Sequence, residues 1–332
     1  MSYATSAMIE LTTALLATAA LLPLVLILLQ RRKMIDVPNA RSSHLGVVHR
    51  GGGLACVGGA ILGLAAGQMD GGETVSWRLV GLVVLLALIG LLDDIATLPA
   101  IPRLAAQVAV GGTAGWLIDQ GALWLFAGLL VIPACVNVVN FMDGIDGITG
   151  LTVGVWGAIA VVLGLTHDCR GLVAIGVASA GAAIGFLPAN LPRARMFLGD
   201  VGSYFLGGLV GVGLLIGWQD GVPAIALAAP LSVYLTDSGC TLVQRTLRRE
   251  SVMSAHRDHI YQRLVDGEGL THPVVAAYVA SLSAVVGLTW ALGSAWLAAP
   301  LTAIVLLAYL ESIPIARTWR RVAALCPGSG GT

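Results

Sequence analysis

Charge is scarce in this sequence: only 11% of its 332 residues are Asp, Glu, Lys or Arg, whereas soluble domains carry about 25%. Hydrophobic residues make up 57% of the chain and stand in continuous runs rather than in alternation. Such runs favour membrane-spanning helices over barrel strands, because in lipid the backbone polar groups must be satisfied within the segment. The net charge is zero, which argues against nucleic acid as a partner.

The sequence also lacks the motifs of several common classes of metal site and enzyme. The five cysteines are scattered without a CxxC or other metal spacing, so we interpret them as small apolar residues. Lys33 is the only lysine, and the sequence has no Walker loop, HExxH, GxSxG elbow or dinucleotide fingerprint. No basic residue precedes the first apolar stretch, 11–29, and three follow it, which is the reverse of a secretory signal.

The hydrophobic runs predict an all-α, polytopic transmembrane bundle that forms one domain over 1–332. About eleven spans are expected, near 8–30, 53–69, 77–92, 103–119, 122–139, 151–166, 171–188, 202–218, 221–238, 272–289 and 294–310. With the N-terminus outside and the C-terminus cytoplasmic, 16 of the 18 basic residues fall on the cytoplasmic side, a strong positive-inside bias. The longer, chemically rich loops fall on that side too.

Two acidic groups follow apolar spans on this side. Asp93 and Asp94 end a span, where the helix dipole disfavours negative charge, so that a nearby cation would stabilise them. A hydrated helix end is the plainer alternative. Asn140, Asp143 and Asp146 recur every three residues, which places them on one face of a helical turn.

Two further loops complete the set. Asp200 stands between glycines after Arg193 and Arg195, and it is expected either to bind a hard cation beside a phosphate-binding arginine or to cap a helix. The largest loop, 239–271, carries arginines that could hold anionic lipid. It also contains His256 and His259 at helical spacing, which could bind phosphate or share a proton.

These residue types suit one kind of chemistry. Mg²⁺ takes one or two carboxylates and completes its shell with water and substrate phosphate, and arginine suits the phosphate itself. Phosphoryl transfer relies on such positioning and charge neutralisation. The sequence therefore predicts an active site formed by cytoplasmic loops near 31–53, 93–103, 140–150, 189–203 and 239–271.

Seven segments together carry a resemblance to a known family. They are 36–44, the Arg-Gly-Gly-Gly at 50–53, Asp93-Asp94, Arg103 with Gln107, 140–147, 197–203 and the His-bearing loop at 256–263. In order and spacing they resemble the polyprenyl-phosphate N-acetylhexosamine-1-phosphate transferases, bacterial members of which begin O-antigen or peptidoglycan lipid assembly.

The resemblance implies a reaction and its participants. Undecaprenyl phosphate would attack the sugar-linked phosphate of a UDP-N-acetylhexosamine and release UMP, with Mg²⁺ as cofactor and Mn²⁺ as the alternative ion. The protein would lie in the bacterial inner membrane, among membrane lipid, with a homodimer as one candidate assembly. Direct and double displacement both stay open.

The resemblance also implies roles for single residues. Catalytic roles fall to Asp93, Asp94, Asp143 and His259, and Mg²⁺ ligation to Asp94 and Asp200. Asp93 would deprotonate or orient the lipid phosphate, and Asp146 with Phe197 would contact the uracil. Substrate contacts fall to Asn140, Asp146, Phe197, His256, Arg257, Arg50, Arg103 and Arg195.

One departure bears on the sugar. Tyr261 and Gln262 stand where other subgroups of the family carry histidine, a variant that resembles the subgroup acting on N-acetylated deoxyamino sugars. A GlcNAc-1-phosphate transferase is the alternative within the family. A secondary transporter is the rival from another class, but transporters place their coupling acids near the midplane, and a lipid-binding scaffold leaves the acidic clusters unexplained.

Overall fold

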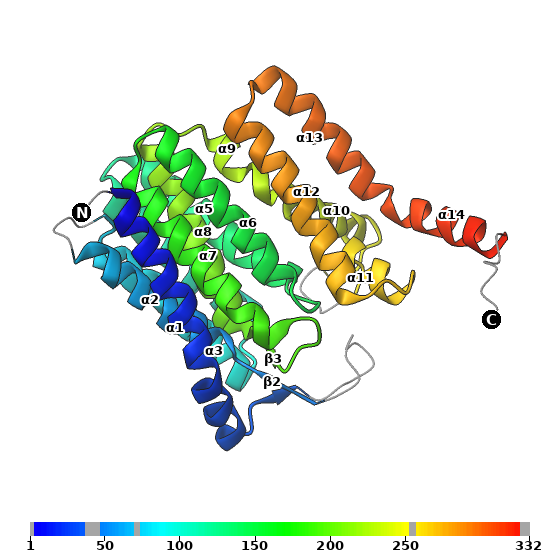
Figure 1. Ribbon diagram of the computed structural model, residues 1–332, viewed down its shortest axis with the longest axis horizontal. Coiled ribbons are helices and arrows are strands. Elements are labelled where there is room, and N and C mark those ends of the chain that lie inside the picture. Colours follow the sequence, from blue (N-terminus) through cyan, green and yellow to red (C-terminus); the bar gives the residue numbers. More distant parts are fainter. Residues whose placement is uncertain (1–2, 37–46, 70–73, 252–256, 326–332) are drawn as a thin grey trace.

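The computed structural model describes residues 3–36, 47–69, 74–251 and 257–325, and it is helical apart from one very small sheet (Figure 1). The long helices in the first two thirds of the chain are α1 (Tyr3–Arg32), α2 (Gly53–Gln68), α3 (Trp77–Ala96), α4 (Ala100–Ile118), α5 (Ala122–Met142), α6 (Ile148–Thr166), α7 (Arg170–Asn190) and α8 (Gly199–Gln219). The remainder comprises α9 (Ala224–Ala228), the 3₁₀ turn η1 (Ala229–Leu231), α10 (Ser232–Leu247), α11 (Ile260–Asp266), α12 (His272–Leu292), α13 (Ala295–Leu310) and α14 (Ser312–Leu325).

Helices α7 and α8 form the centre of the bundle. Most of their residues are buried, with α1, α2 and α6 packed on α7, and α3 and α5 packed on α8. Helices α12 and α13 lie side by side at one edge, and α14 continues outward from them (Figure 1). A second, separate apolar cluster lies beneath α11 and joins it to α10, α12 and the turn after α5.

A three-stranded sheet brings two distant loops together. β1 (Ile35–Asp36) pairs antiparallel with β2 (Val48–Arg50), and β2 pairs parallel with β3 (Met196–Phe197). Arg50 thereby lies opposite Phe197. The all-α prediction did not include these strands, because segments of two or three residues carry no detectable periodicity. Their consequence is that the loop after α1 and the loop before α8 meet.

The helical prediction is confirmed: ten of the eleven expected segments each fall on one long helix to within a residue or two, and 221–238 covers α9, η1 and the first part of α10. Within the described part of the chain, eight helices are long and apolar enough to cross a membrane, or nine if the bent pair α13–α14 forms one span. Helix α2 has only 16 residues, about 24 Å at the usual rise, and α4 is not among the eight. The chain is a multi-pass membrane protein, while the count of eleven and the orientation stay predictions.

Candidate active site

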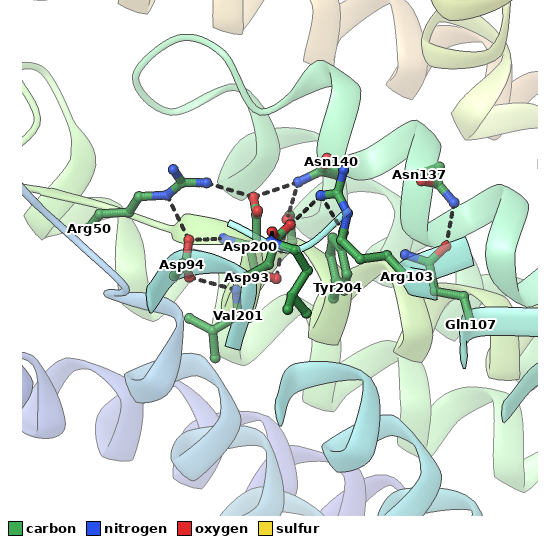
Figure 2. Close-up of polar contacts among 12 residues, drawn as sticks. Arg50, Asp93, Asp94, Arg103, Gln107, Asn137, Asn140, Asp200, Val201 and Tyr204 are labelled. Atoms are coloured by element: carbon green, nitrogen blue, oxygen red, sulfur yellow. Dashed lines mark hydrogen bonds and ion pairs between the residues drawn. The ribbon is translucent and has the colours of Figure 1, made fainter. Parts of the chain in front are cut away.

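Arg50 bridges two of the predicted site carboxylates (Figure 2). Its Nε lies 2.6 Å from Asp94 Oδ1, and its terminal Nη2 lies 2.9 Å from Asp200 Oδ1. The Asp94 side chain is completely buried and the Asp200 side chain is 14% exposed, whereas Arg50 is 40% exposed. The guanidinium therefore faces outward while it neutralises two inward-facing anions.

Asp94 also joins two helices. Its carboxylate accepts the backbone N–H groups of Asp200, at 2.9 Å, and of Val201, at 3.0 Å, in the first turn of α8. These amides have no partner within their own helix, and the positive end of the helix dipole favours an anion there. Asp94, at the end of α3, thus fixes the start of α8 and with it the position of Asp200.

Gly199 makes this approach possible. It has a φ of +75°, and a Cβ there would lie 2.7 Å from Asp94 Oδ2 and 2.9 Å from the Gly51 nitrogen. Any other residue would meet both strain and a clash. The glycine before Asp200, noticed in the sequence as a flank, is therefore required by the contact between Asp94 and the α8 terminus.

Asn140 approaches Asp200 from a third helix. Its Nδ2 donates to Asp200 Oδ1 at 2.9 Å and to the Ser203 hydroxyl at 3.0 Å. Asn140 lies in the last turn of α5, so side chains from β2, α3, α5 and α8 converge on one point (Figure 2). The geometry therefore brings predicted residues of four of these loops together, while the active site itself stays a prediction.

Asp93 faces a different partner from Asp94. Its Oδ1 accepts the Leu98 N–H at 2.7 Å, and its Oδ2 forms an ion pair with Arg103, whose Nη1 also lies 3.2 Å from the Tyr204 hydroxyl. One helical turn further along α4, Gln107 accepts from Asn137 at 2.6 Å. The contacts drawn in Figure 2 thus fall into three groups, around Asp94 and Asp200, around Arg103, and between Gln107 and Asn137.

Asp143 and Asp146 lie in the turn after α5. Burial, together with the neighbouring charges of Asp94 and Asp146, raises the pKa of Asp143 to about 6, although Arg50 lowers it in part. The Asp146 carboxylate accepts the Ala194 N–H at 3.0 Å and lies 3.3 Å from His272 Nδ1. Asp146 thus connects its turn to the loop before β3 and to the start of α12.

The other predicted residues that the structure describes make polar contacts outside the cluster of Asp94 and Asp200. Arg257 pairs with Asp266 of α11 at 3.3 Å, and the Nδ1 of buried His259 lies 3.1 Å from Asp237. His256 lies outside the described residues, as do positions 37–46 of the first motif. The guanidinium of Arg195 donates to the Pro188 carbonyl at 2.7 Å, at the end of α7.

The amino-acid sequence is similar to those of several known proteins. Residues 76–217 match the family model described as glycosyl transferase family 4. A Bacillus subtilis protein named probable undecaprenyl-phosphate N-acetylglucosaminyl 1-phosphate transferase is 26% identical, over 76% of each chain. A Mycobacterium tuberculosis decaprenyl-phosphate N-acetylglucosaminephosphotransferase is 28% identical, over 78% of this chain and 75% of that one. A Synechococcus phospho-N-acetylmuramoyl-pentapeptide-transferase is 32% identical, over 56% of this chain and 64% of that one.

The chain belongs to glycosyl transferase family 4. It is a membrane phosphotransferase of the polyprenyl-phosphate N-acetylhexosamine-1-phosphate transferase family. The matched segment contains Asp93, Asp94, Asn140 and Asp200, whereas Arg50 and α11 lie outside it. The contacts of Arg50 therefore extend the site beyond the segment that the family model matches.

The donor set of this glycosyl transferase fits a hard divalent cation that has few protein ligands. Asp94 and Asp200 present carboxylate oxygens toward the same guanidinium, and Mg²⁺ is commonly held by one or two carboxylates plus substrate phosphate and water. Across the described ranges, no group of three or more His, Cys, Asp or Glu side chains could hold a metal ion. The residues present thus suit an ion that is completed by substrate.

Four side chains that contact predicted site residues were not singled out from the sequence: Ser203, Tyr204, Asp237 and His272. Tyr204 and Ser203 lie in the first turns of α8 and bind Arg103 and Asn140, and His272 contacts Asp146. Tyr204 carried no signal, because aromatic residues are common in such helices. Asp237 could have been found from the sequence, because an ionisable residue within an apolar span usually has a functional role.

Proposed function

We propose that this protein transfers an N-acetylated amino-sugar 1-phosphate from a UDP-sugar to undecaprenyl phosphate and releases UMP. The observation that carries the proposal is the convergence of Asp94, Asp200, Asn140 and Arg50 from four separate elements. The names of the relatives from Bacillus subtilis and Mycobacterium tuberculosis support the two substrate classes. The product would be the first lipid-linked intermediate of O-antigen or a related glycan.

In this reaction a phosphate oxygen of the lipid forms a bond to the sugar-linked phosphorus. The bond from that phosphorus to the oxygen of the UMP phosphate breaks, and UMP leaves with the electron pair. Two anionic substrates must approach each other, so charge neutralisation is the main requirement. Arg50 and Arg103 provide fixed positive charge on either side of the carboxylates.

Asp94 and Asp200 are the residues that would hold Mg²⁺. When bound, the ion would neutralise diphosphate charge and polarise the bond to the leaving group. Asn140 supports this role, because its amide fixes Asp200 Oδ1 without adding charge. Arg50 lies between both carboxylates and is exposed on its outer side, so the same guanidinium can also reach an incoming phosphate.

Asp93 and Asp143 suit different tasks. Both oxygens of Asp93 are engaged, by Arg103 and by the Leu98 N–H, so Asp93 is better suited to orient Arg103 toward the lipid phosphate than to take a proton. Asp143 has a pKa raised to about 6, which places it close to the range where a general base works best. We therefore assign proton acceptance to Asp143.

The sugar is the finer part of the proposal. The relatives from Bacillus subtilis and Mycobacterium tuberculosis are named for N-acetylglucosamine, whereas Tyr261 and Gln262 depart from the histidine pattern toward the deoxyamino-sugar variant. The donor should be a UDP-N-acetylated hexosamine or its deoxy analogue. We place the reaction at the cytoplasmic face of a bacterial inner membrane.

The test is release of UMP by the purified protein, given undecaprenyl phosphate, Mg²⁺ and a panel of UDP-N-acetyl sugars. We expect UMP and lipid-linked sugar in equal amounts, and loss of both when EDTA replaces Mg²⁺. Omission of the lipid separates transfer from simple hydrolysis. A protein that releases no UMP with any donor would instead be a transporter or a scaffold, and the proposal would fail.

A further inference from the structure

Asp237 is a fully buried carboxylate that takes no part in the cluster of Asp93, Asp94 and Asp200. It lies on α10, beside the apolar cluster that includes Tyr234, Tyr261 and Tyr309. A carboxylate buried in such surroundings is costly unless donors satisfy it. Its oxygens accept from the Ile260 N–H at 3.0 Å, the Tyr261 N–H at 3.3 Å, the Tyr309 hydroxyl at 2.5 Å and His259 Nδ1 at 3.1 Å.

These donors show that Asp237 caps α11 from another helix. His259 is the N-cap residue of α11, and its own side chain makes no capping hydrogen bond. The first amides of the helix, from Ile260 and Tyr261, instead point at Asp237. A carboxylate that already accepts two backbone amides is an acceptor for the imidazole as well, and the arrangement we propose therefore places the His259 hydrogen on Nδ1. Any contact between His259 and a substrate then has to use Nε2.

Tyr261 connects α11 to the catalytic turn. Its hydroxyl donates to the Phe141 carbonyl at 3.1 Å, at the end of α5 and two residues before Asp143. Gly144 permits this contact, since a Cβ there would lie 2.2 Å from the Tyr261 hydroxyl. Met142 and Ile145 of the same turn pack in the apolar cluster with Ile260 and Tyr261. A continuous set of contacts therefore links Asp237 to Asn140 and Asp143.

We propose that Asp237 is a positioning residue for the transfer reaction: it fixes the His259 ring and holds α11 against the turn of Asn140 and Asp143. This inference rests on the proposed function, because it assigns the positioned groups to sugar-phosphate transfer. It also gives the departure at position 261 a structural meaning. The tyrosine joins α11 to the turn through its hydroxyl, in addition to any influence on the choice of sugar.

The central variant is Asp237→Asn, tested in the full-length protein in detergent. Asparagine keeps the shape and one acceptor oxygen but loses the charge that orients Nδ1. We expect kcat/KM to fall about 10- to 100-fold, the effect of weakening a charged hydrogen bond. His259→Gln should lower kcat/KM by a similar factor. The double variant should lose little more, because both changes disrupt the same contact between Asp237 and His259. Multiplicative losses would show that Asp237 acts independently of His259 and would overturn the proposal.

A spectroscopic readout separates positioning from mere folding. In protein labelled with ¹⁵N-histidine, with His259→Gln used to assign the signal, wild-type His259 should show a protonated Nδ1. In Asp237→Asn the Nδ1 signal should move toward that of an unprotonated nitrogen. An unchanged signal would overturn the proposal. This measurement needs no turnover, so an inactive wild type would defeat the proposed function and leave the positioning of His259 still under test.

Two further variants keep the test decisive if Asp237→Asn does not fold. Tyr261→Phe removes only the hydroxyl that reaches Phe141, and it should lower kcat severalfold and speed hydrogen exchange in residues 140–148. Thr241→Val is the matched control, because the Thr241 hydroxyl donates only a long hydrogen bond, of 3.4 Å, to Asp237 Oδ1 from within α10 and has no link to α11 among the contacts described. Wild-type kinetics and exchange in Tyr261→Phe, or an equal loss in Thr241→Val, would refute the positioning role.

Discussion

Replacing Arg50 by alanine should make the stability of this protein depend on Mg²⁺. Arg50 is the cation between Asp94 and Asp200, and its removal leaves the two carboxylates with neutral hydrogen-bond donors but without their shared positive charge. Truncating one partner of a buried ion pair costs about 3–5 kcal/mol. Because the Arg50 side chain is 40% exposed, solvent screening reduces the expected loss to about 2 kcal/mol.

The assay is thermal unfolding in detergent, followed by tryptophan fluorescence, with EDTA or with millimolar Mg²⁺. In EDTA, Arg50→Ala should unfold several degrees below the wild type. Mg²⁺ should restore most of this difference in the variant and change the wild type less, because a divalent ion can take the place of the guanidinium between the carboxylates. Arg195→Ala is the control, since that guanidinium contacts only a carbonyl at the end of α7 among the contacts described.

Two results would refute this reasoning. If Arg50→Ala unfolds like the wild type in EDTA, Arg50 does not neutralise the pair in solution. If Mg²⁺ raises the unfolding temperature of both proteins equally, the ion binds elsewhere and Asp94 with Asp200 is not its site. Adding Asp200→Asn to the Arg50→Ala background should remove the Mg²⁺ response, which ties the effect to one carboxylate.

Three other predictions follow from the same geometry. Asp200→Asn and Asp94→Asn should each lower kcat at least about 100-fold while the protein still elutes as a folded species; near-normal UMP release would remove that residue from the metal site. Arg257→Ala should raise the KM for the UDP-sugar about 10-fold, whereas Asp266→Asn, which only breaks its salt bridge, should not, and equal effects would make the pair structural. With a pKa raised from 3.8 to about 6, Asp143 is a base only above pH 6, so kcat should rise through that pH, a limb that Asp143→Asn should abolish. The neutral form stabilises the fold fully below pH 3.8, and this contribution is lost as pH rises through 6.

The helices and the general place of the site could be predicted from the sequence, because continuous apolar runs define helices in lipid whatever surrounds them. Asp93-Asp94, Asn140 and Asp200 follow or begin such runs, so they could be assigned to one side by alternation alone. Residues assigned to the same side of the membrane can form one site, and the contacts among Asp94, Asn140 and Asp200 agree with that assignment. The sequence could not show which carboxylate meets which cation, because that depends on side-chain direction.

The small sheet and the contacts of Asp237 could not be predicted from the sequence. Pairing of Arg50 with Phe197 joins strands of three and two residues almost 150 positions apart, and such short strands have no periodic signal. Asp237 is an acid near the end of the apolar stretch expected at 221–238. Its partners come from α11 and α13, and only the packing of those helices reveals that it caps one of them.

The charge balance of the site connects Arg50 to catalysis. Four carboxylates, Asp93, Asp94, Asp143 and Asp200, are matched by two guanidinium groups, those of Arg50 and Arg103. A UDP-sugar and a lipid phosphate would add further negative charge to a region that already carries an excess. If the Arg50 guanidinium binds the incoming diphosphate instead of the carboxylates, Asp94 and Asp200 lose their cation when another anion arrives. Binding of donor and of a divalent ion must therefore favour each other, because each relieves the repulsion that the other would meet alone. The position of Arg50 between the two carboxylates is the structural reason for that coupling.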